Sequence, residues 1–278
     1  MKKIIIIANS KKDIFSLGDY LRIVSILPNF KTKFIYWFCD KKIRNLIKYS
    51  EHIKKIYPIK KFNYKNFNKK NNLIINLFKI KNLKPNEYSV PNMINKDIDI
   101  KFSGINLCKK ITSNLGIKKY KIYSNKIIRN KNKYDLFINY LAPKKWKKKE
   151  YPIKNLNYIE KKLKKKFHNI KICKQMKSDN LDQYIKKIYS SELILSIIGL
   201  GVHIGMLFNK KIIVLSGPTF FNELKKYKKG KIIFPEGSNK WKKNLEMKNI
   251  NKEKILNSII IKLKKSIKIS HDIKKTKI

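Results

Sequence analysis

Residues 193–215 read LILSIIGLGVHIGMLFNKKIIVL, and this pattern indicates the fold class. Leu193–Ile197 and Lys211–Leu215 are short apolar runs rich in isoleucine, which is typical of strands buried on both faces. Between them a glycine-containing turn precedes an apolar segment, from about Val202 to Phe208, that is long enough for a short helix. A strand, a helix and a second strand in this order predict a parallel sheet covered by helices.

The same alternation recurs outward along the chain in both directions. Strands are expected at 3–8, 34–39, 54–58, 73–78, 134–140 and 170–173, and helices at 19–27, 41–49, 103–115, 154–167, 180–189 and 252–265. Asn and Lys replace large apolar residues near 126–133, which marks a boundary. We therefore predict an α/β protein with an N-terminal domain at 1–130, a C-terminal domain at 131–265 and a basic, frayed tail at 266–278.

Lysine dominates the charge, since Lys plus Arg is 68 against 18 for Asp plus Glu, a formal +50. Arg22, Arg44 and Arg129 are the only arginines, while Ile, Lys and Asn are abundant, as an AT-rich coding sequence would give. Arginine pairs bidentately with guanine and phosphate, whereas lysine is a point charge. Its scarcity favours compositional bias for most of the charge and leaves an anionic partner, such as a membrane surface, for the rest.

Cysteine spacing and the apolar runs indicate the compartment. Cys39, Cys108 and Cys173 are widely spaced, which predicts free buried thiols and neither a disulfide nor a metal site. The N-terminal apolar run, Ile4 to Ala8, is shorter than the roughly 7 to 15 residues of a secretory signal. Residues 193–208 fall short of the roughly 18 apolar residues of a spanning helix. We expect a cytoplasmic protein, either free or peripheral on the inner membrane.

Ligands of open parallel sheets bind beyond the carboxyl ends of the strands, so the loop after the first strand of each half is informative. In the first half, Ser16, Leu17, Gly18 and Asp19 stand directly before a helix. Gly18 lets the backbone approach a ligand, and the dipole at a helix N-terminus keeps the Asp19 carboxylate ionised and available as a base. The structural alternative is that Asp19 only caps its helix.

The second half offers two anion-binding turns. In the lysine-rich turn 143–149, the ammonium groups of Lys145 and Lys149 can meet a diphosphate, or the run is simply solvated. In the turn 198–203, two glycines lead into a helix whose backbone N–H groups form an anion site. His203 either donates to a phosphate or is a core residue. A carboxylate in one half and an anion site in the other favour group transfer from a nucleotide-activated donor.

The order of these motifs resembles glycosyltransferase family 9, the bacterial heptosyltransferases of lipopolysaccharide assembly. Residues 16–22 (SLGDYLR) are similar to its SLGD-x-LR, and 145–152 (KWKKKEYP) to its RWPTK-x-x-P. Residues 200–207 (LGVHIGML) resemble its D-T-x-G-x-H-x-A-x-A-L, and 214–219 (VLSGPT) its LFGPT. The resemblance spans nearly the whole chain and is weakest from about 79 to 131.

The resemblance implies a GT-B fold, in which two Rossmann-like domains enclose a cleft, with the acceptor bound by the N-terminal domain and the nucleotide sugar by the C-terminal one. It implies inverting, metal-independent transfer of a sugar such as heptose from ADP-heptose to a lipopolysaccharide-core or other lipid-linked saccharide, without a cofactor. Asp19 would be the catalytic base, with Ser16 and Gly18 in the acceptor-side loop. The residues implied to bind the donor are Lys145, Lys149, Leu200, Gly201, His203, Gly217 and Thr219.

Several residues depart from the family pattern. Ile198-Gly199 stands where the family has Asp-Thr, which removes a carboxylate and a hydroxyl from the donor site. Leu141 replaces a glycine, and Lys147 replaces a proline. The cysteines that the family has near its C-terminal end are absent from this sequence, which has Glu246 just before Met247. These changes are consistent with a donor other than ADP-heptose or with a decayed, non-catalytic GT-B scaffold. A polycationic nucleic-acid binder is the third alternative.

Overall fold

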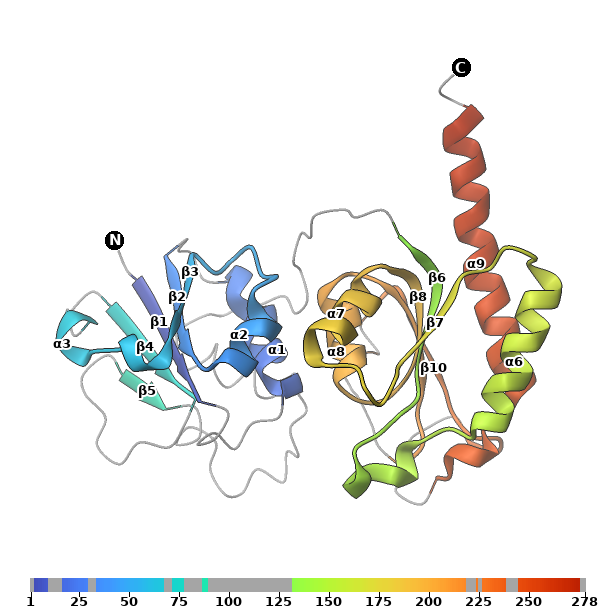
Figure 1. Cartoon of the computed structure of the whole chain (residues 1–278), viewed down its shortest axis with the longest axis horizontal. Helices are drawn as coiled ribbons and strands as arrows, with labels where there is room; N and C mark the ends of the chain where they lie inside the picture. The colour runs from blue at the N-terminus through green and yellow to red at the C-terminus, as the bar shows by residue number, and fades with distance from the viewer. Residues whose placement is uncertain are drawn as a thin grey trace. The chain divides into compact units, whose positions relative to one another are not determined.

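The computed structural model describes residues 3–9, 17–29, 34–67, 72–77, 87–89, 132–218, 224, 227–238 and 245–275. The chain divides into two compact units, Met1–Ile128 and Arg129–Ile278 (Figure 1). Each unit is built on a five-stranded sheet in which every described strand pair is parallel. The predicted α/β class, with two Rossmann-like halves, is therefore confirmed. The expected helix at 103–115 and residues Ser16 and Thr219 lie outside the described residues.

The sheet of the first unit has the order β3-β2-β1-β4-β5. Its strands are β1 (Lys3–Ala8), β2 (Ile35–Cys39), β3 (Lys55–Pro58), β4 (Asn72–Asn76) and β5 (Glu87–Ser89). Its helices are α1 (Leu17–Ile26), η1 (Leu27–Asn29), α2 (Lys41–Ile47), η2 (Ile59–Lys61) and α3 (Tyr64–Phe67). The central strand β1 is buried from Ile4 to Ala8, as its run of isoleucines predicts.

The second unit has the strand order β10-β9-β8-β6-β7. Its strands are β6 (Tyr134–Asn139), β7 (Ile172–Lys174), β8 (Ser191–Ile197), β9 (Lys211–Leu215) and β10 (Gly230–Ile233). Its helices are η3 (Lys144–Lys149), α6 (Ile153–Lys166), α7 (Leu181–Tyr189), α8 (Leu200–Leu207), η5 (Met247–Asn249) and α9 (Lys252–Lys275). The β8–α8–β9 unit predicted from residues 193–215 is confirmed.

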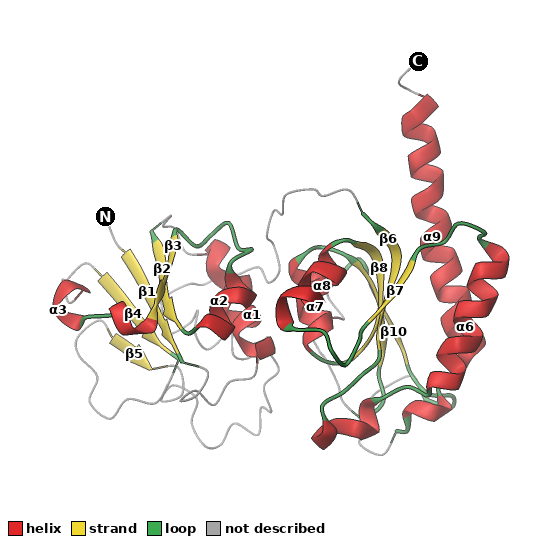
Figure 2. Cartoon of the chain, viewed as in Figure 1, coloured by secondary structure: helices red, strands yellow, loops and turns green. Residues whose placement is uncertain are grey.

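Helices cover both faces of this second sheet (Figure 2). On one face, α6 and α9 bury their apolar stripes in a cluster with strand residues such as Leu136, Leu193 and Ile213. On the other face lie α7 and α8, where Phe137 meets Tyr184 edge to face at 5.9 Å between ring centroids. Alternate residues of each strand therefore point to opposite helical layers, which places both faces in the core.

Two expectations about the helices require correction. Helix α9 continues to Lys275, so the prediction of a frayed tail from residue 266 is wrong. The reason is local, because residues 266–275 contain neither Gly nor Pro and lysine is a good helix former. Residues 144–149, expected as a turn, form the 3-10 helix η3.

No helix among the described residues has the length and apolar character needed to span a membrane.

One buried hydrogen bond ties the segment before α6 to the segment before α9. The Tyr151 hydroxyl donates to the Ile250 carbonyl at 2.9 Å, and both residues are buried. We expect Tyr151→Phe to lower the free energy of unfolding by about 1–3 kcal/mol, because the carbonyl loses its buried donor.

Chemical denaturation measures this loss. Tyr140→Phe is the matched control, since Tyr140 packs on the same core and the described structure shows no hydrogen bond from its hydroxyl. Equal stability of the two variants would contradict a role for the Tyr151 hydrogen bond.

Candidate functional site

Three neighbouring strands of the second unit end at one edge of its sheet. Asn139 at the end of β6 lies opposite Ser196 of β8, and Ile197 lies opposite Leu215 at the end of β9. The segments that leave from this edge carry the residues predicted to bind the donor: η3 with Lys145 and Lys149, α8 with Leu200, Gly201 and His203, and Gly217 after β9. We call the ends of β6, β8 and β9 with these segments the carboxyl edge.

A buried chain of hydrogen bonds lies beneath the start of α8. The Tyr184 hydroxyl donates to Asn139 Oδ1 at 3.0 Å, and Asn139 Nδ2 donates to Ser196 Oγ at 2.6 Å. Ser196 in turn donates to the Ile197 carbonyl at 2.7 Å. Burial raises the pKa of Tyr184, which keeps its hydroxyl protonated as the first donor. This chain of hydrogen bonds links α7 to the ends of β6 and β8. Each side chain in it donates to the next, so the orientation of every polar group is fixed.

Gly201 rests directly on this chain. A Cβ atom there would lie 2.5 Å from the Tyr184 hydroxyl oxygen and 2.6 Å from Asn139 Nδ2. A Cβ at Gly199, the residue that precedes α8, would meet no atom within 4 Å. The first turn of α8 therefore packs tightly at Gly201 and has open space beside Gly199. The N–H groups at the start of a helix favour an anion in such a position.

His203 lies further along the same helix and is 6% exposed. All of α8 from Gly201 onward is buried, and the helix has no charged residue. This position agrees with the core alternative for His203, and its part in donor binding stays a prediction.

The loop after β6 is held at two points. The Leu141 N–H donates to Gln175 Oε1 at 3.0 Å, and the Ala142 N–H donates to Glu150 Oε1 at 3.1 Å. This loop leads into η3, in which Lys149 is partly buried with its Nζ 4.2 Å from the Trp146 ring centroid. Burial lowers the pKa of Lys149.

Lysines 144, 147 and 148 are exposed, in contrast with Lys149. The side chain of Lys145 lies outside the described residues. Among the η3 lysines whose side chains the structure describes, Lys149 is therefore the one that the fold holds in place.

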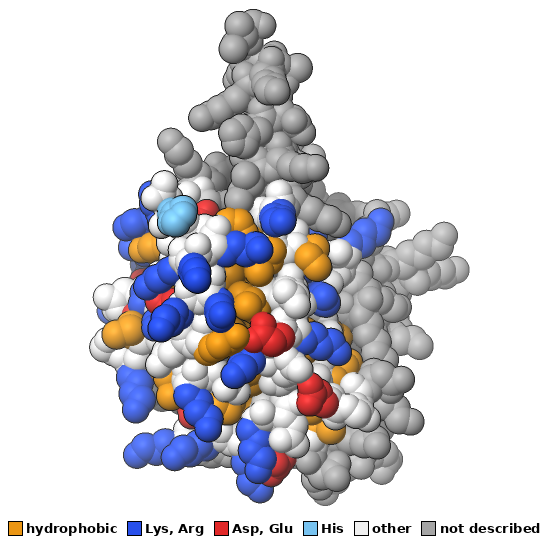
Figure 3. All heavy atoms as spheres, turned by 90° about the vertical axis from the view of Figure 1, so that its right-hand side faces the viewer, with side chains coloured by type: hydrophobic (Ala, Val, Ile, Leu, Met, Phe, Trp, Pro, Cys, Tyr) orange, Lys and Arg blue, Asp and Glu red, His pale blue; other side chains and the backbone are white. Residues whose placement is uncertain are grey.

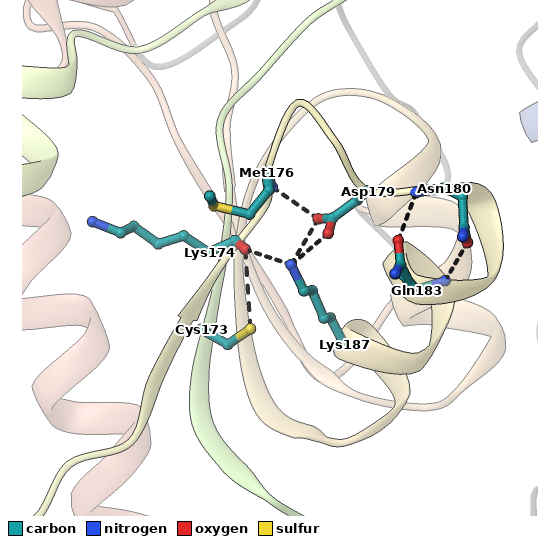
Figure 4. A network of polar contacts seen from close by, with 7 residues as sticks. All are labelled: Cys173, Lys174, Met176, Asp179, Asn180, Gln183 and Lys187. Atoms are coloured by element: carbon teal, nitrogen blue, oxygen red, sulfur yellow. Dashed lines mark hydrogen bonds and ion pairs between the residues drawn. The ribbon is translucent and has the colours of Figure 1, made fainter.

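An ion pair secures the segment that carries Gln175 (Figure 4). Lys187 Nζ of α7 lies 2.6 and 2.8 Å from the two carboxylate oxygens of Asp179 and donates to the Lys174 carbonyl at 3.2 Å. Asp179 also accepts from the Met176 N–H at 2.8 Å. Residues 174–179 are thus fastened to α7, and Gln175, which donates its own N–H to the Ile138 carbonyl at 2.9 Å, holds the loop after β6. This network was not predicted from the sequence.

A pocket of about 450 Å³ opens at the carboxyl edge beside Gly217. Its lining comes from the end of η3, the start of α6 and the segment around η5, and consists of Lys147, Lys148, Glu150, Pro152, Pro218, Leu245, Glu246, Met247 and Lys248. Gly217 is buried, and a side chain there would collide with the Met247 thioether. Gly217 therefore shapes one wall of the pocket by letting Met247 approach.

Asp19 belongs to the first unit, where α1 begins at Leu17, so that Asp19 lies in the first turn of the helix and not at its cap position. It is 5% exposed, and the neighbouring Gly18 is buried as well. A carboxylate in this position is favoured by the helix dipole. Within the described ranges no group of three His, Cys, Asp or Glu side chains could hold a metal ion.

Neither a protein-family model nor a curated protein sequence matches the chain. Solved structures do. The glycosyl transferase family 9 structure from Veillonella parvula DSM 2008 has a TM-score of 0.63 at 12% identity over 95% of this chain and 98% of that chain. Escherichia coli ADP-heptose LPS heptosyltransferase II has a TM-score of 0.67 at 11% identity over 95% and 99%.

The E. coli heptosyltransferase WaaC with ADP-2-deoxy-2-fluoro heptose has a TM-score of 0.60 at 11% identity over 93% of this chain and 99% of that chain. The chain therefore has the fold of family 9 glycosyltransferases and heptosyltransferases, as its motifs predict.

The packing of Gly201 predicts a difference between two neighbouring glycines. We expect Gly201→Ala to lower the free energy of unfolding by about 1–3 kcal/mol, because the new methyl group must displace Tyr184 or Asn139. Gly199→Ala is the matched control and should be nearly neutral, since its methyl group meets open space. Thermal unfolding compares the two. Combining Gly201→Ala with Tyr184→Phe should recover part of the loss, and no recovery would mean that Tyr184 is not the obstacle.

The contact between Gln175 and Leu141 predicts a local change in amide protection. We expect Gln175→Met to raise hydrogen exchange at the Leu141 amide at least tenfold, because the amide loses its acceptor. Gln175→Glu keeps a carboxylate oxygen in reach and should preserve most of the protection. Equal exchange in both variants would show that the side-chain oxygen does not hold this loop.

Proposed function

We propose that the protein is a glycosyltransferase that moves a sugar from a nucleotide-diphosphate donor, ADP-heptose or a relative of it, to a lipopolysaccharide-core or other lipid-linked saccharide. The observation that most supports this is the start of α8, where Gly201 packs on a fully bonded buried chain and the residue before the helix faces open space. Because the chain shares its fold with heptosyltransferases, we interpret the start of α8 as a site for a nucleotide-sugar donor.

The donor diphosphate is proposed to lie over the N–H groups at the start of α8, with Lys149 supplying positive charge. Helix-terminal amides and a fixed ammonium group can stabilise a departing diphosphate without a metal ion. The pocket beside Gly217, with a volume of about 450 Å³, has the size of a small-molecule site. Its carboxylates Glu150 and Glu246 suit the hydroxyl groups of a ribose or a sugar.

Transfer then follows an inverting, single-displacement course. The Asp19 carboxylate takes the proton of the acceptor hydroxyl as that oxygen forms a bond to the anomeric carbon. The bond from this carbon to the diphosphate breaks on the opposite side, and its electron pair leaves with the diphosphate. The acceptor side is assigned to the first unit through Ser16, Gly18 and Asp19, and the donor side to the carboxyl edge, including Thr219.

The absence of the family's Asp-Thr pair affects which sugar the donor site can bind. It does not affect the N–H groups at the start of α8. Ile198-Gly199 removes two side chains that would contact a sugar, while the space at Gly199 stays open. This favours a donor sugar other than heptose, or a lower affinity for heptose. A decayed scaffold is the second candidate, and the same substitution is the observation that favours it.

The acceptor and the site of action are also part of the proposal. A lipid-linked saccharide would be bound at the cytoplasmic face of the inner membrane, where each lysine near anionic lipid contributes about 1 kcal/mol to binding.

A nucleic-acid function has less support. Among the described side chains Trp146, at 47% exposure, is the one exposed aromatic residue, and Lys149 covers its ring.

The first test is calorimetric titration with ADP-heptose, ADP, UDP and GDP. We expect saturable binding of one nucleotide class, weakened tenfold to a hundredfold by Lys149→Met, because a charge-assisted contact worth about 1.5–3 kcal/mol is lost. Lys186→Met removes an exposed lysine of α7 and serves as the charge-matched control. Asp19→Asn should bind the donor normally and transfer no sugar. Weak, equal binding of every polyanion would replace the transferase with the scaffold.

The pH dependence follows from the lowered pKa of Lys149. A lysine whose pKa is lowered by burial loses its proton at a lower pH than it does in the unfolded chain, so donor affinity should fall as the pH rises through a value below 10.5. At neutral pH its charge opposes folding, and Lys149→Met should therefore raise the melting temperature while it weakens binding. A parallel loss of stability and binding would contradict this assignment.

A further inference from the structure

Positive charge is distributed unequally over the two faces of the second unit. On one side, α6 and the described side chains of α9 carry nine exposed lysines: Lys154, Lys161, Lys162, Lys164, Lys165, Lys166, Lys252, Lys254 and Lys264. Glu160 and Glu253 are the acidic residues among them. On the other side, α7 and α8 together carry Lys186, Lys187 and Asp182. Each side has one ion pair that involves these lysines, Lys164 with Glu160 on α6 and Lys187 with Asp179 on the other side, so the difference lies in the number of exposed lysines. The lysine-rich composition of the chain applies to both sides alike, so it does not explain why exposed lysines are more numerous on one of them.

The basic side also exposes apolar side chains (Figure 3). Ile261 of α9 is 54% exposed, and Ile153 at the first position of α6 is 48% exposed. Lys254, Ile261 and Lys264 follow one another at helical spacing, which places the isoleucine on the outward stripe between two lysines. We call the nine lysines with Ile153 and Ile261 the α6–α9 face.

This combination fits the headgroup region of a bilayer better than a nucleic acid. Lysines there meet anionic lipid, and an exposed isoleucine between them enters the boundary of the acyl chains. A single-stranded nucleic acid would in addition stack its bases on exposed aromatic rings. The half-buried Tyr158 on this side has Lys252 Nζ at 4.2 Å and Lys162 Nζ at 5.5 Å from its ring centroid, so its ring is already in contact with two ammonium groups.

We propose that the α6–α9 face docks the protein on an anionic membrane. Helix α6 begins shortly after η3 and α9 shortly after η5, both at the carboxyl edge. A bilayer against this face therefore lies beside the loops proposed to hold the donor. The proposal rests on charge and apolar exposure alone and does not depend on the transferase activity.

Vesicle sedimentation of the full chain tests the proposal. The probes are vesicles of phosphatidylcholine alone and of phosphatidylcholine with about one third phosphatidylglycerol, in about 0.1 M salt. We expect binding to the anionic vesicles only. Lys161→Glu with Lys165→Glu should weaken it at least tenfold, and Ile261→Ser about tenfold.

The matched control reverses two exposed lysines that are not part of the α6–α9 face, Lys177→Glu between β7 and α7 with Lys186→Glu in α7. It changes the net charge equally and should weaken binding less than threefold. Circular dichroism and nucleotide titration of every variant show that the fold and the donor site are intact, so a failure here is distinct from a failure of the transferase proposal.

Three results would overturn the proposal. Equal losses in the two double variants would show that the whole polycation binds without a preferred face. Equal binding to neutral vesicles would remove the electrostatic basis. Loss of binding to a single-stranded RNA oligonucleotide in Lys161→Glu with Lys165→Glu, with vesicle binding unchanged, would assign the face to nucleic acid.

Discussion

The geometry of the carboxyl edge depends on the buried hydrogen-bond chain from Tyr184 through Asn139 to Ser196. Burying these polar groups without partners would cost several kcal/mol, and each is satisfied by the next member of the chain. Because the chain occupies the space directly under Gly201, it fixes how closely α8 approaches the strands. The direction of the helix N-terminus, and hence of any anion bound there, follows from this packing.

A second set of contacts extends this order to the loop after β6. The ion pair between Asp179 and Lys187 fastens the β7–α7 segment, and Gln175 of that segment accepts the Leu141 amide. Parallel pairing brings the ends of β6, β8 and β9 to one edge, so the two sets of contacts act on adjacent loops. The glycine expected at position 141 is absent, but the loop has a defined conformation because its amide has a defined acceptor.

Much of this architecture could be predicted from the sequence, because strands buried on both faces read as continuous apolar runs. The isoleucines of β1 and the residues 193–215 gave nearly correct bounds for that reason. The polar chain was missed because Asn139, Tyr184 and Ser196 are far apart in sequence and each has an ordinary explanation alone. One available signal was the pair of polar residues at the ends of two apolar strands. The end of α9 was missed because the lysine-rich tail suggested fraying, although nothing in it breaks a helix.

The excess of lysine shows why position carries more information than composition. An AT-rich coding sequence explains why lysine is common, but it acts on every exposed position alike. The sheet of the second unit separates α6 and α9 from α7 and α8, and among the described side chains of these four helices only the first pair presents a dense array of exposed lysines with isoleucine among them. Lys149 is an example within the candidate site, since it differs from the exposed Lys144, Lys147 and Lys148 by its burial and by its contact with Trp146. Function in such a chain is therefore to be sought where the fold constrains a lysine, or where it gathers many of them on one face.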